Sequence, residues 1–77
     1  MIPLALIRGL ERYRDDHLPT GSFLRSVLQG DLFEAALRAD AESSTVLAAV
    51  ALHVMRELPA DSWGSREKVN AWLDPKP

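Results

Sequence analysis

The fold of this chain is decided by the stretch Leu18-Pro19-Thr20-Gly21-Ser22-Phe23-Leu24. Pro19 lacks the amide hydrogen that continues a helix, and it disfavours helical backbone at the residue before it, so a helix must end there. Thr20 or Ser22 can then cap a new helix that starts beside them. The stretch therefore predicts two helices joined by a short turn.

The apolar residues before this turn recur at helical spacing. Residues 3–16 predict a first helix, because apolar side chains stand three residues apart at Leu4, Ile7 and Leu10. The other face carries acidic and basic residues three or four positions apart, which can pair across one helical turn. We interpret that charged face as exposed to solvent.

Two more short helices are predicted after the turn. Gly30 ends the helix that Thr20 or Ser22 opens, because a glycine is usual where a left-handed residue follows a helix. Asp31 and Glu34 then form a D-x-x-E capping box that opens a third helix. Four apolar residues of this third helix are expected to face the core: Leu32, Phe33, Ala36 and Leu37.

The longest helix is predicted to run from Asp40 or Ser43 to Leu58. Its apolar stripe consists of Leu47, Val50, Val54 and Leu58. Small alanines beside the stripe allow a close helix approach, either within the domain or between two copies of the chain. Ser65 marks the start of a last helix, and residues 74–77 are expected to form a frayed tail.

These elements predict an all-α protein: a compact bundle of four to five short helices, with no sheet, forming a single domain over residues 1–77. Its hydrophobic content of 47% is typical of globular chains. No segment alternates β-branched and polar residues as a strand would. The chain has no cysteine, which excludes disulfides and thiolate metal ligands.

The composition argues against several functions. A net charge of −2 has the wrong sign for neutralising a nucleic-acid backbone, so no DNA or RNA partner is expected. The apolar start of the chain stops at Arg8, too short for a membrane span and without the features of a signal peptide. We therefore expect a cytoplasmic protein with no membrane partner.

Catalytic and metal-binding patterns are not found either. His17 and His53 lie far apart, so no metal site and no cofactor are predicted. The serines lack the sequence context of an activated nucleophile, and the carboxylates are dispersed. We predict no catalytic residue and no enzyme activity.

Two helix-start turns, Thr20-Gly21-Ser22 and Gly64-Ser65-Arg66, contain the candidate ligand-binding residues. Glycine lets a ligand approach backbone donors, and a helix start favours negative charge. Ordinary capping is the favoured interpretation of both turns, because nearly every helix start needs a cap, and ligand binding is the alternative. Neighbouring arginines can bind phosphate, and Trp63 offers either a stacking surface or a lid on the core. The predicted ligand-binding residues are Thr20, Gly21, Ser22, Arg25, Trp63, Ser65 and Arg66.

The order of these residues also carries a resemblance. The pattern is Pro19-Thr20-Gly21-x-Phe23-Leu24-x-x-Val27-Leu28-x-x-Asp31-Leu32-x-x-Ala35-x-x-Arg38-Ala39-Asp40, then Leu58-Pro59, then Trp63-Gly64-Ser65-x-x-x-Val69-x-x-Trp72. Across about residues 10–73, the chain resembles a family of small accessory proteins encoded by tailed bacteriophages and prophages. The resemblance implies a phage accessory protein and transfers no catalytic residues.

Phage accessory proteins of this size commonly act by binding, so the resemblance implies interference with bacterial anti-phage immunity in the host cytoplasm. We predict a homo-oligomer that sequesters a nucleotide-derived signalling molecule. The alternative is a protein-interaction module that masks a host defence protein or serves as a phage structural or regulatory adaptor. The nucleotide hypothesis further expects the two helix-start turns to come together, with Trp63 facing them.

Overall fold

The computed structural model of the protein describes residues 2–74, which form helices and no strand. The α-helices are α1 (Leu4–Asp16), α2 (Ser22–Leu28), α3 (Leu32–Arg38), α4 (Ala41–Thr45), α5 (Leu47–Glu57) and α6 (Arg66–Leu73). A single turn of 3-10 helix, η1 (Ala60–Ser62), precedes α6. The all-α class is therefore confirmed for this part of the chain. Apart from Asp74, the predicted tail lies outside the described residues.

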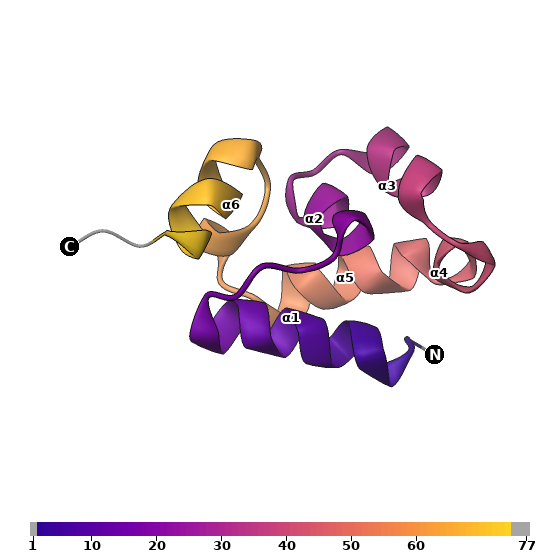
Figure 1. Ribbon diagram of the computed structural model, residues 1–77, viewed down its shortest axis with the longest axis horizontal. Helices are drawn as coiled ribbons and strands as arrows, with labels where there is room; N and C mark the ends of the chain where they lie inside the picture. Colours follow the sequence, from indigo (N-terminus) through magenta and orange to yellow (C-terminus); the bar gives the residue numbers. More distant parts are fainter. Residues whose placement is uncertain (1, 75–77) are drawn as a thin grey trace.

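Helix α2 is the hub of the arrangement, because it packs against α3, α5 and α6. The molecule measures 39 × 23 × 19 Å. Helices α1 and α5 follow its long axis, with α6 toward one end and α3 and α4 toward the other (Figure 1). A polar hollow and an apolar groove lie beside α2.

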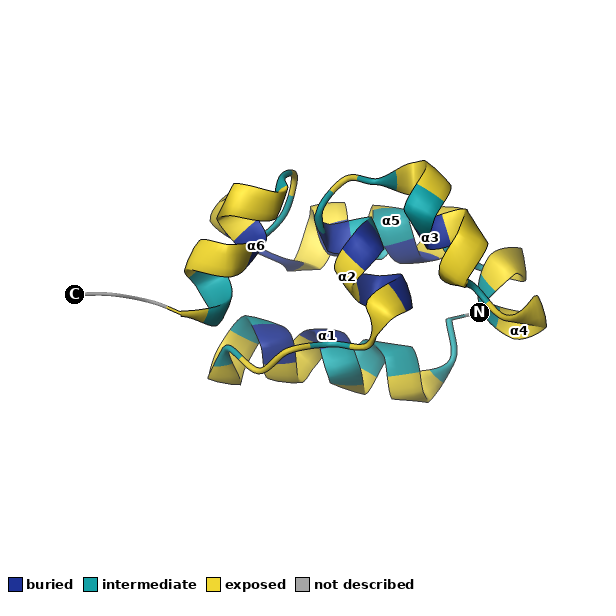
Figure 2. Ribbon diagram, turned by 45° about the horizontal axis from the view of Figure 1, so that its top comes forward, coloured by how far each residue is buried: buried dark blue, intermediate teal, exposed yellow. Residues whose placement is uncertain are grey.

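Ten buried apolar side chains form the core, and α4 contributes none of them (Figure 2). They are Leu10, Tyr13, Phe23, Leu24, Leu28, Ala35, Val50, Val54, Leu58 and Val69. Each large apolar side chain in this set contributes about 1.5–3 kcal/mol by leaving water. The core positions predicted at Val50, Val54 and Leu58 are confirmed.

The predicted core face of α3 is wrong. Phe33 is 84% exposed and Leu37 79% exposed, Leu32 and Ala36 are exposed as well, and the buried residue is Ala35. Successive residues of a helix are rotated by about 100°, so the side opposite Ala35 carries residues 33 and 37. The small Ala35 side chain allows α3 to pack closely, which leaves the bulky side chains pointing outward.

The predicted longest helix is in fact two helices. Val46 has φ −117° and ψ 12°, outside helical geometry, and it separates α4 from α5. The Thr45 hydroxyl donates to the Glu42 carbonyl at 2.7 Å, and Ser44 makes a similar local bond. Such bonds compete with the helical ladder, which explains the break after a Ser-Ser-Thr segment. The predicted number of helices, four to five, is therefore too low.

The predicted side-chain cap of α2 is also wrong. Gly21 occupies the N-cap position, and no side chain caps the helix. Thr20 lies one residue too early and Ser22 is already helical, so neither hydroxyl reaches the free amides of the first turn. Asp31 and Ser65, in contrast, accept backbone amide hydrogens at 3.0 and 3.1 Å as predicted. The predicted capping box is only half formed, because the Asp31 amide donates to the Ser26 carbonyl and not to Glu34.

Hydrogen bonds between distant residues join α1 to η1 and α6. The Tyr13 hydroxyl donates to the Ser62 carbonyl, and the Trp72 indole N–H donates to the Tyr13 carbonyl, both at 2.7 Å. His17 ends α1 with a left-handed φ of 57°. Its Nδ1 lies 2.7 Å from the Trp72 carbonyl oxygen, and its ring lies 4.6 Å from the indole. These contacts fix α6 against α1.

Candidate functional site

The two helix-start turns lie at opposite ends of α2. The Gly64 amide donates to the carbonyl of Leu28, the last residue of α2, at 2.7 Å. Thr20-Gly21-Ser22 stands at the other end of the same helix. Because seven helical residues span about 10 Å, the structure does not bring the two turns themselves together.

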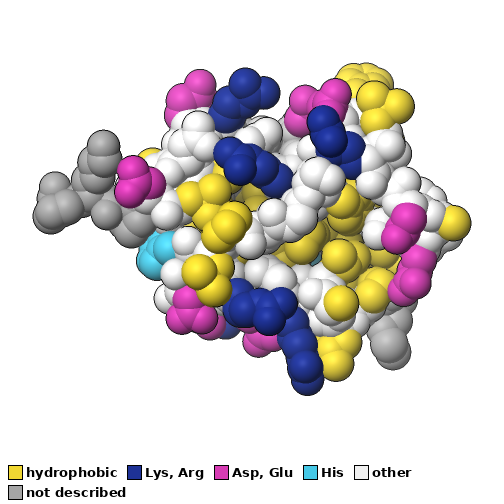
Figure 3. Space-filling view, viewed as in Figure 1, with side chains coloured by type: hydrophobic (Ala, Val, Ile, Leu, Met, Phe, Trp, Pro, Cys, Tyr) yellow, Lys and Arg dark blue, Asp and Glu magenta, His cyan; other side chains and the backbone are white. Residues whose placement is uncertain are grey.

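Three predicted ligand-binding residues nevertheless share one site. Ser22, Arg25 and Arg66 line an open hollow of about 660 Å³ beside α2, α3 and α6. Arg25 Nη2 donates to Asn70 Oδ1 of α6 at 3.0 Å, which joins the polar sides of α2 and α6. Figure 3 shows basic side chains on this side of the molecule, over α6 and over α3. We call this site the arginine hollow; its other lining residues are Ser26, Gln29, Asp31, Glu34 and Arg38.

The acidic residues of the arginine hollow are already engaged. Asp31 caps α3, and Glu34 accepts a hydrogen bond from Arg38 Nε at 3.0 Å. Within residues 2–74, no carboxylate forms an ion pair with Arg25 or Arg66. Two guanidinium groups therefore remain available for an anion, and guanidinium binds phosphate or carboxylate through paired hydrogen bonds.

Ser26 adds a hydroxyl donor to the arginine hollow. The residue is only 6% exposed, and it lines the hollow.

Ser26 was not among the sequence-predicted site residues, although a signal for it was present. Ser22, Arg25, Ser26 and Gln29 stand at positions i, i+3, i+4 and i+7, which lie on one side of a helix. Its burial could not be predicted, because burial depends on how α3 and α6 pack beside α2. Arg38 also lines the hollow, because α3 packs beside α2.

The remaining predicted site residues lie elsewhere. Thr20 and Gly21 border a separate depression against α1, and the Thr20 hydroxyl donates to the Gly21 carbonyl at 3.2 Å. Ser65 is occupied as the cap of α6. Gly21 and Ser65 are N-cap residues, and neither they nor Thr20 line the arginine hollow.

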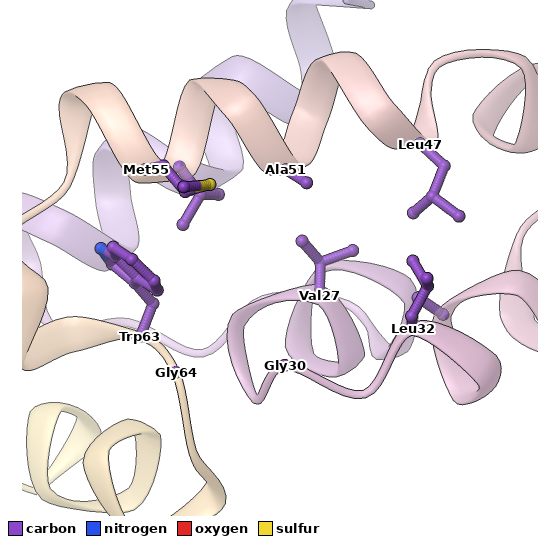
Figure 4. Close-up of a pocket in the computed structure, with 10 residues that line it drawn as sticks. Val27, Gly30, Leu32, Leu47, Ala51, Met55, Trp63 and Gly64 are labelled. Atoms are coloured by element: carbon purple, nitrogen blue, oxygen red, sulfur yellow. The ribbon is translucent and has the colours of Figure 1, made fainter.

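Trp63 belongs to an apolar groove and not to the arginine hollow. Its indole N–H donates to the Leu58 carbonyl at 3.2 Å. Its ring lies at one end of a groove of about 350 Å³, with Met55 of α5 nearby and Val27 and Leu32 on the facing side (Figure 4). The indole therefore offers no stacking surface to a ligand held by Arg25 and Arg66.

Comparison with protein-family models, with curated proteins and with solved structures gave no match. The resemblance to phage accessory proteins therefore stays a prediction. In the described part of the chain, no three His, Asp or Glu side chains are grouped as metal ligands. None of the helices formed by residues 2–74 has the length and apolar character needed to cross a membrane.

Proposed function

We propose that this protein is a non-enzymatic binding protein that holds a small phosphate-bearing molecule in the arginine hollow. The observation that carries the proposal is that Arg25 and Arg66, both without a carboxylate partner among the described residues, line the same hollow together with Ser26. Arg25 of α2 and Arg66 of α6 are 41 positions apart in the sequence, so only the fold brings them to one site.

The size and charge of the hollow support this class of ligand. Small-molecule sites commonly enclose about 300–1,000 Å³, and the arginine hollow has about 660 Å³. Three arginines face two carboxylates around it, which leaves a local positive charge on a chain whose net charge is −2. A local charge of opposite sign to the whole molecule favours anions at that place.

The lining residues favour recognition of phosphate rather than of a base. None of the residues around the hollow is aromatic, and Trp63 is directed to the apolar groove. A nucleotide would therefore be bound mainly through its phosphates. Among small phosphate-bearing molecules, the family resemblance implies a nucleotide-derived immune signal as the ligand. A phage protein would bind this signal in the host cytoplasm.

Isothermal titration calorimetry tests the proposal with pyrophosphate, AMP, ADP-ribose and a set of cyclic oligonucleotides. We expect the ligands with two or more phosphates to bind more tightly than AMP, because two guanidinium groups can then be engaged. Hydrogen bonds to charged groups contribute about 1.5–3 kcal/mol, so Arg25→Gln or Arg66→Gln should weaken binding by about tenfold to a hundredfold.

Arg8→Gln is the matched control, because Arg8 is exposed on α1, outside the hollow, and its substitution changes the net charge equally. Its affinity should stay close to that of the wild type, and Trp63→Phe should behave likewise. Recovery of intact ligand after long incubation would separate binding from turnover. No binding to any of these ligands, or equal losses in the Arg8 and Arg25 variants, would overturn the proposal.

A further inference from the structure

Asn70 of α6 contacts a residue of the arginine hollow but does not itself line the hollow. Its Oδ1 accepts a hydrogen bond from Arg25 Nη2 at 3.0 Å, across the junction where α6 packs beside α2. Asn70 stands four positions after Arg66, so the two side chains lie on the same side of α6. That side of α6 therefore faces the polar side of α2 that carries Arg25.

The helix alone does not explain an asparagine at position 70. Asparagine is less favourable than alanine inside a helix, because its amide competes for backbone hydrogen bonds. Asn70 is exposed, so core packing does not account for it either. A residue that departs from the local preference is expected where a site requires it. The hydrogen bond to Arg25 is the contact that asparagine provides here and alanine would not.

The amide of Asn70 suits an arginine that has to stay free for an anion. A guanidinium group has five N–H donors and no acceptor, so the amide must present its oxygen to Arg25. Nη2 gives one of its two hydrogens to this oxygen, so at least one paired edge of the guanidinium group stays intact. Because the amide is neutral, it orients the guanidinium group and leaves its charge uncancelled. Apart from the engaged oxygen, the pair presents only N–H donors.

We infer that Asn70 is a positioning residue of the arginine hollow, which holds the Arg25 guanidinium group in place for a phosphate of the ligand. The inference rests on the proposed function and adds to its site a residue outside the lining of the hollow. A side chain that is already held in place loses less conformational freedom when a ligand binds. A carboxylate at position 70 would hold Arg25 as well, but it would compete with the anion. The neutral amide therefore determines that Arg25 accepts an anionic ligand.

Isothermal titration calorimetry with pyrophosphate, at physiological ionic strength, tests this inference. Asn70→Asp is nearly isosteric and places a carboxylate on Arg25, so the affinity should fall about tenfold to a hundredfold, as expected for Arg25→Gln. Asn70→Ala removes the contact but not the charge of Arg25, so the affinity should fall by only about twofold to tenfold. In an Arg25→Gln background, Asn70→Ala should change the affinity by less than about twofold, because Asn70 acts through Arg25.

Ala71→Asp is the matched control, because it adds the same carboxylate to α6 at the next position. Ala71 is exposed, and it stands two positions after the buried Val69, about 200° around the helix, on the side away from the core. Its affinity for pyrophosphate should stay close to that of the wild type, because an exposed charge that does not touch Arg25 is screened by salt. Asn70→Asp should be at least as resistant to urea as Ala71→Asp, which separates a loss of affinity from a loss of folding.

Two outcomes would overturn the inference while the proposed function stands. One is an Asn70→Asp variant that binds pyrophosphate as tightly as Ala71→Asp does. The other is a double variant in which the losses from Asn70→Ala and Arg25→Gln add. A wild type that binds none of the phosphate-bearing ligands would overturn the proposed function itself, and this inference with it.

Discussion

Burial in the core changes the acid–base chemistry of Tyr13. It is the only tyrosine of the chain, it is 1% exposed, and its hydroxyl donates to the Ser62 carbonyl. Burial raises the pKa of Tyr13 from 10.0 to about 12, although the positive charge of Arg25 opposes part of this shift. The folded chain therefore holds the proton more tightly than the unfolded chain.

This pKa shift predicts a loss of stability at high pH. The contribution of Tyr13 is fully present below pH 10, where both states are protonated, and is lost as pH rises toward about 12. Tyrosinate absorbance, which here reports one residue, should have a midpoint near 10 in urea and a clearly higher midpoint in the folded chain. Equal midpoints in the two states would contradict the prediction.

Tyr13→Phe separates the hydroxyl from the ring. The variant keeps the buried ring but leaves the Ser62 carbonyl without its donor, which should cost about 1–3 kcal/mol of unfolding free energy. Urea unfolding at neutral pH measures this loss. The variant should also lack the part of the alkaline destabilisation that Tyr13 causes in the wild type.

At the scale of elements, the junction between the end of α2 and the start of α6 depends on two glycines. Gly30 has a φ of 78°, and a Cβ atom there would lie 3.2 Å from the Gly64 carbonyl oxygen. The Gly64 amide is meanwhile bound to Leu28 of α2. This hydrogen bond holds the two segments together, so little room is left between them for a side chain at Gly30.

Gly30→Ala should therefore destabilise the chain by about 1–2 kcal/mol, the usual cost of left-handed backbone in a residue with a Cβ atom. Gly21→Ala is the control. Gly21 has φ −68°, and a Cβ atom there meets nothing within 4 Å. That variant should cost less than Gly30→Ala, because the freedom that the unfolded chain loses offsets the poorer N-cap preference of alanine. Urea unfolding measures the stability of both variants. A Gly21→Ala variant that is less stable than Gly30→Ala would contradict the explanation.

The whole molecule should unfold as one unit, because α2 packs against three other helices. Leu28 is fully buried at this hub, so Leu28→Ala should cost about 2–5 kcal/mol. A chain of 77 residues has a total stability of roughly 4–12 kcal/mol, so this loss is a large part of the whole. Leu18→Ala, at an exposed site, should change stability by less than about 0.5 kcal/mol.

Two probes measure whether unfolding is cooperative. Trp63 and Trp72 both lie in the last quarter of the chain, so tryptophan fluorescence reports the η1–α6 region, whereas circular dichroism reports all helices. The two transitions should coincide in the wild type and shift together in Leu28→Ala. An earlier fluorescence transition would show that α6 unfolds on its own.

Local sequence signals predicted much of the secondary structure. The α1 helix, the left-handed Gly30, and the caps at Asp31 and Ser65 follow from proline, glycine and capping chemistry, which act within a few residues. The break at Val46 was missed, because helical periodicity continues through it while the competing hydroxyl bonds are weak signals. The all-α class was predicted correctly because it depended on the proline, glycine and capping signals, which are strong.

The sequence by itself thus determined that the chain forms short helices and where most of them begin and end. Only the tertiary structure decided which faces meet. Packing on the small Ala35 turned Phe33 and Leu37 outward, and the docking of α6 on α2 brought Arg66 to Arg25 while leaving Trp63 in the apolar groove. Helix signals are local, whereas the rotation of each helix is set by contacts between residues far apart in the chain.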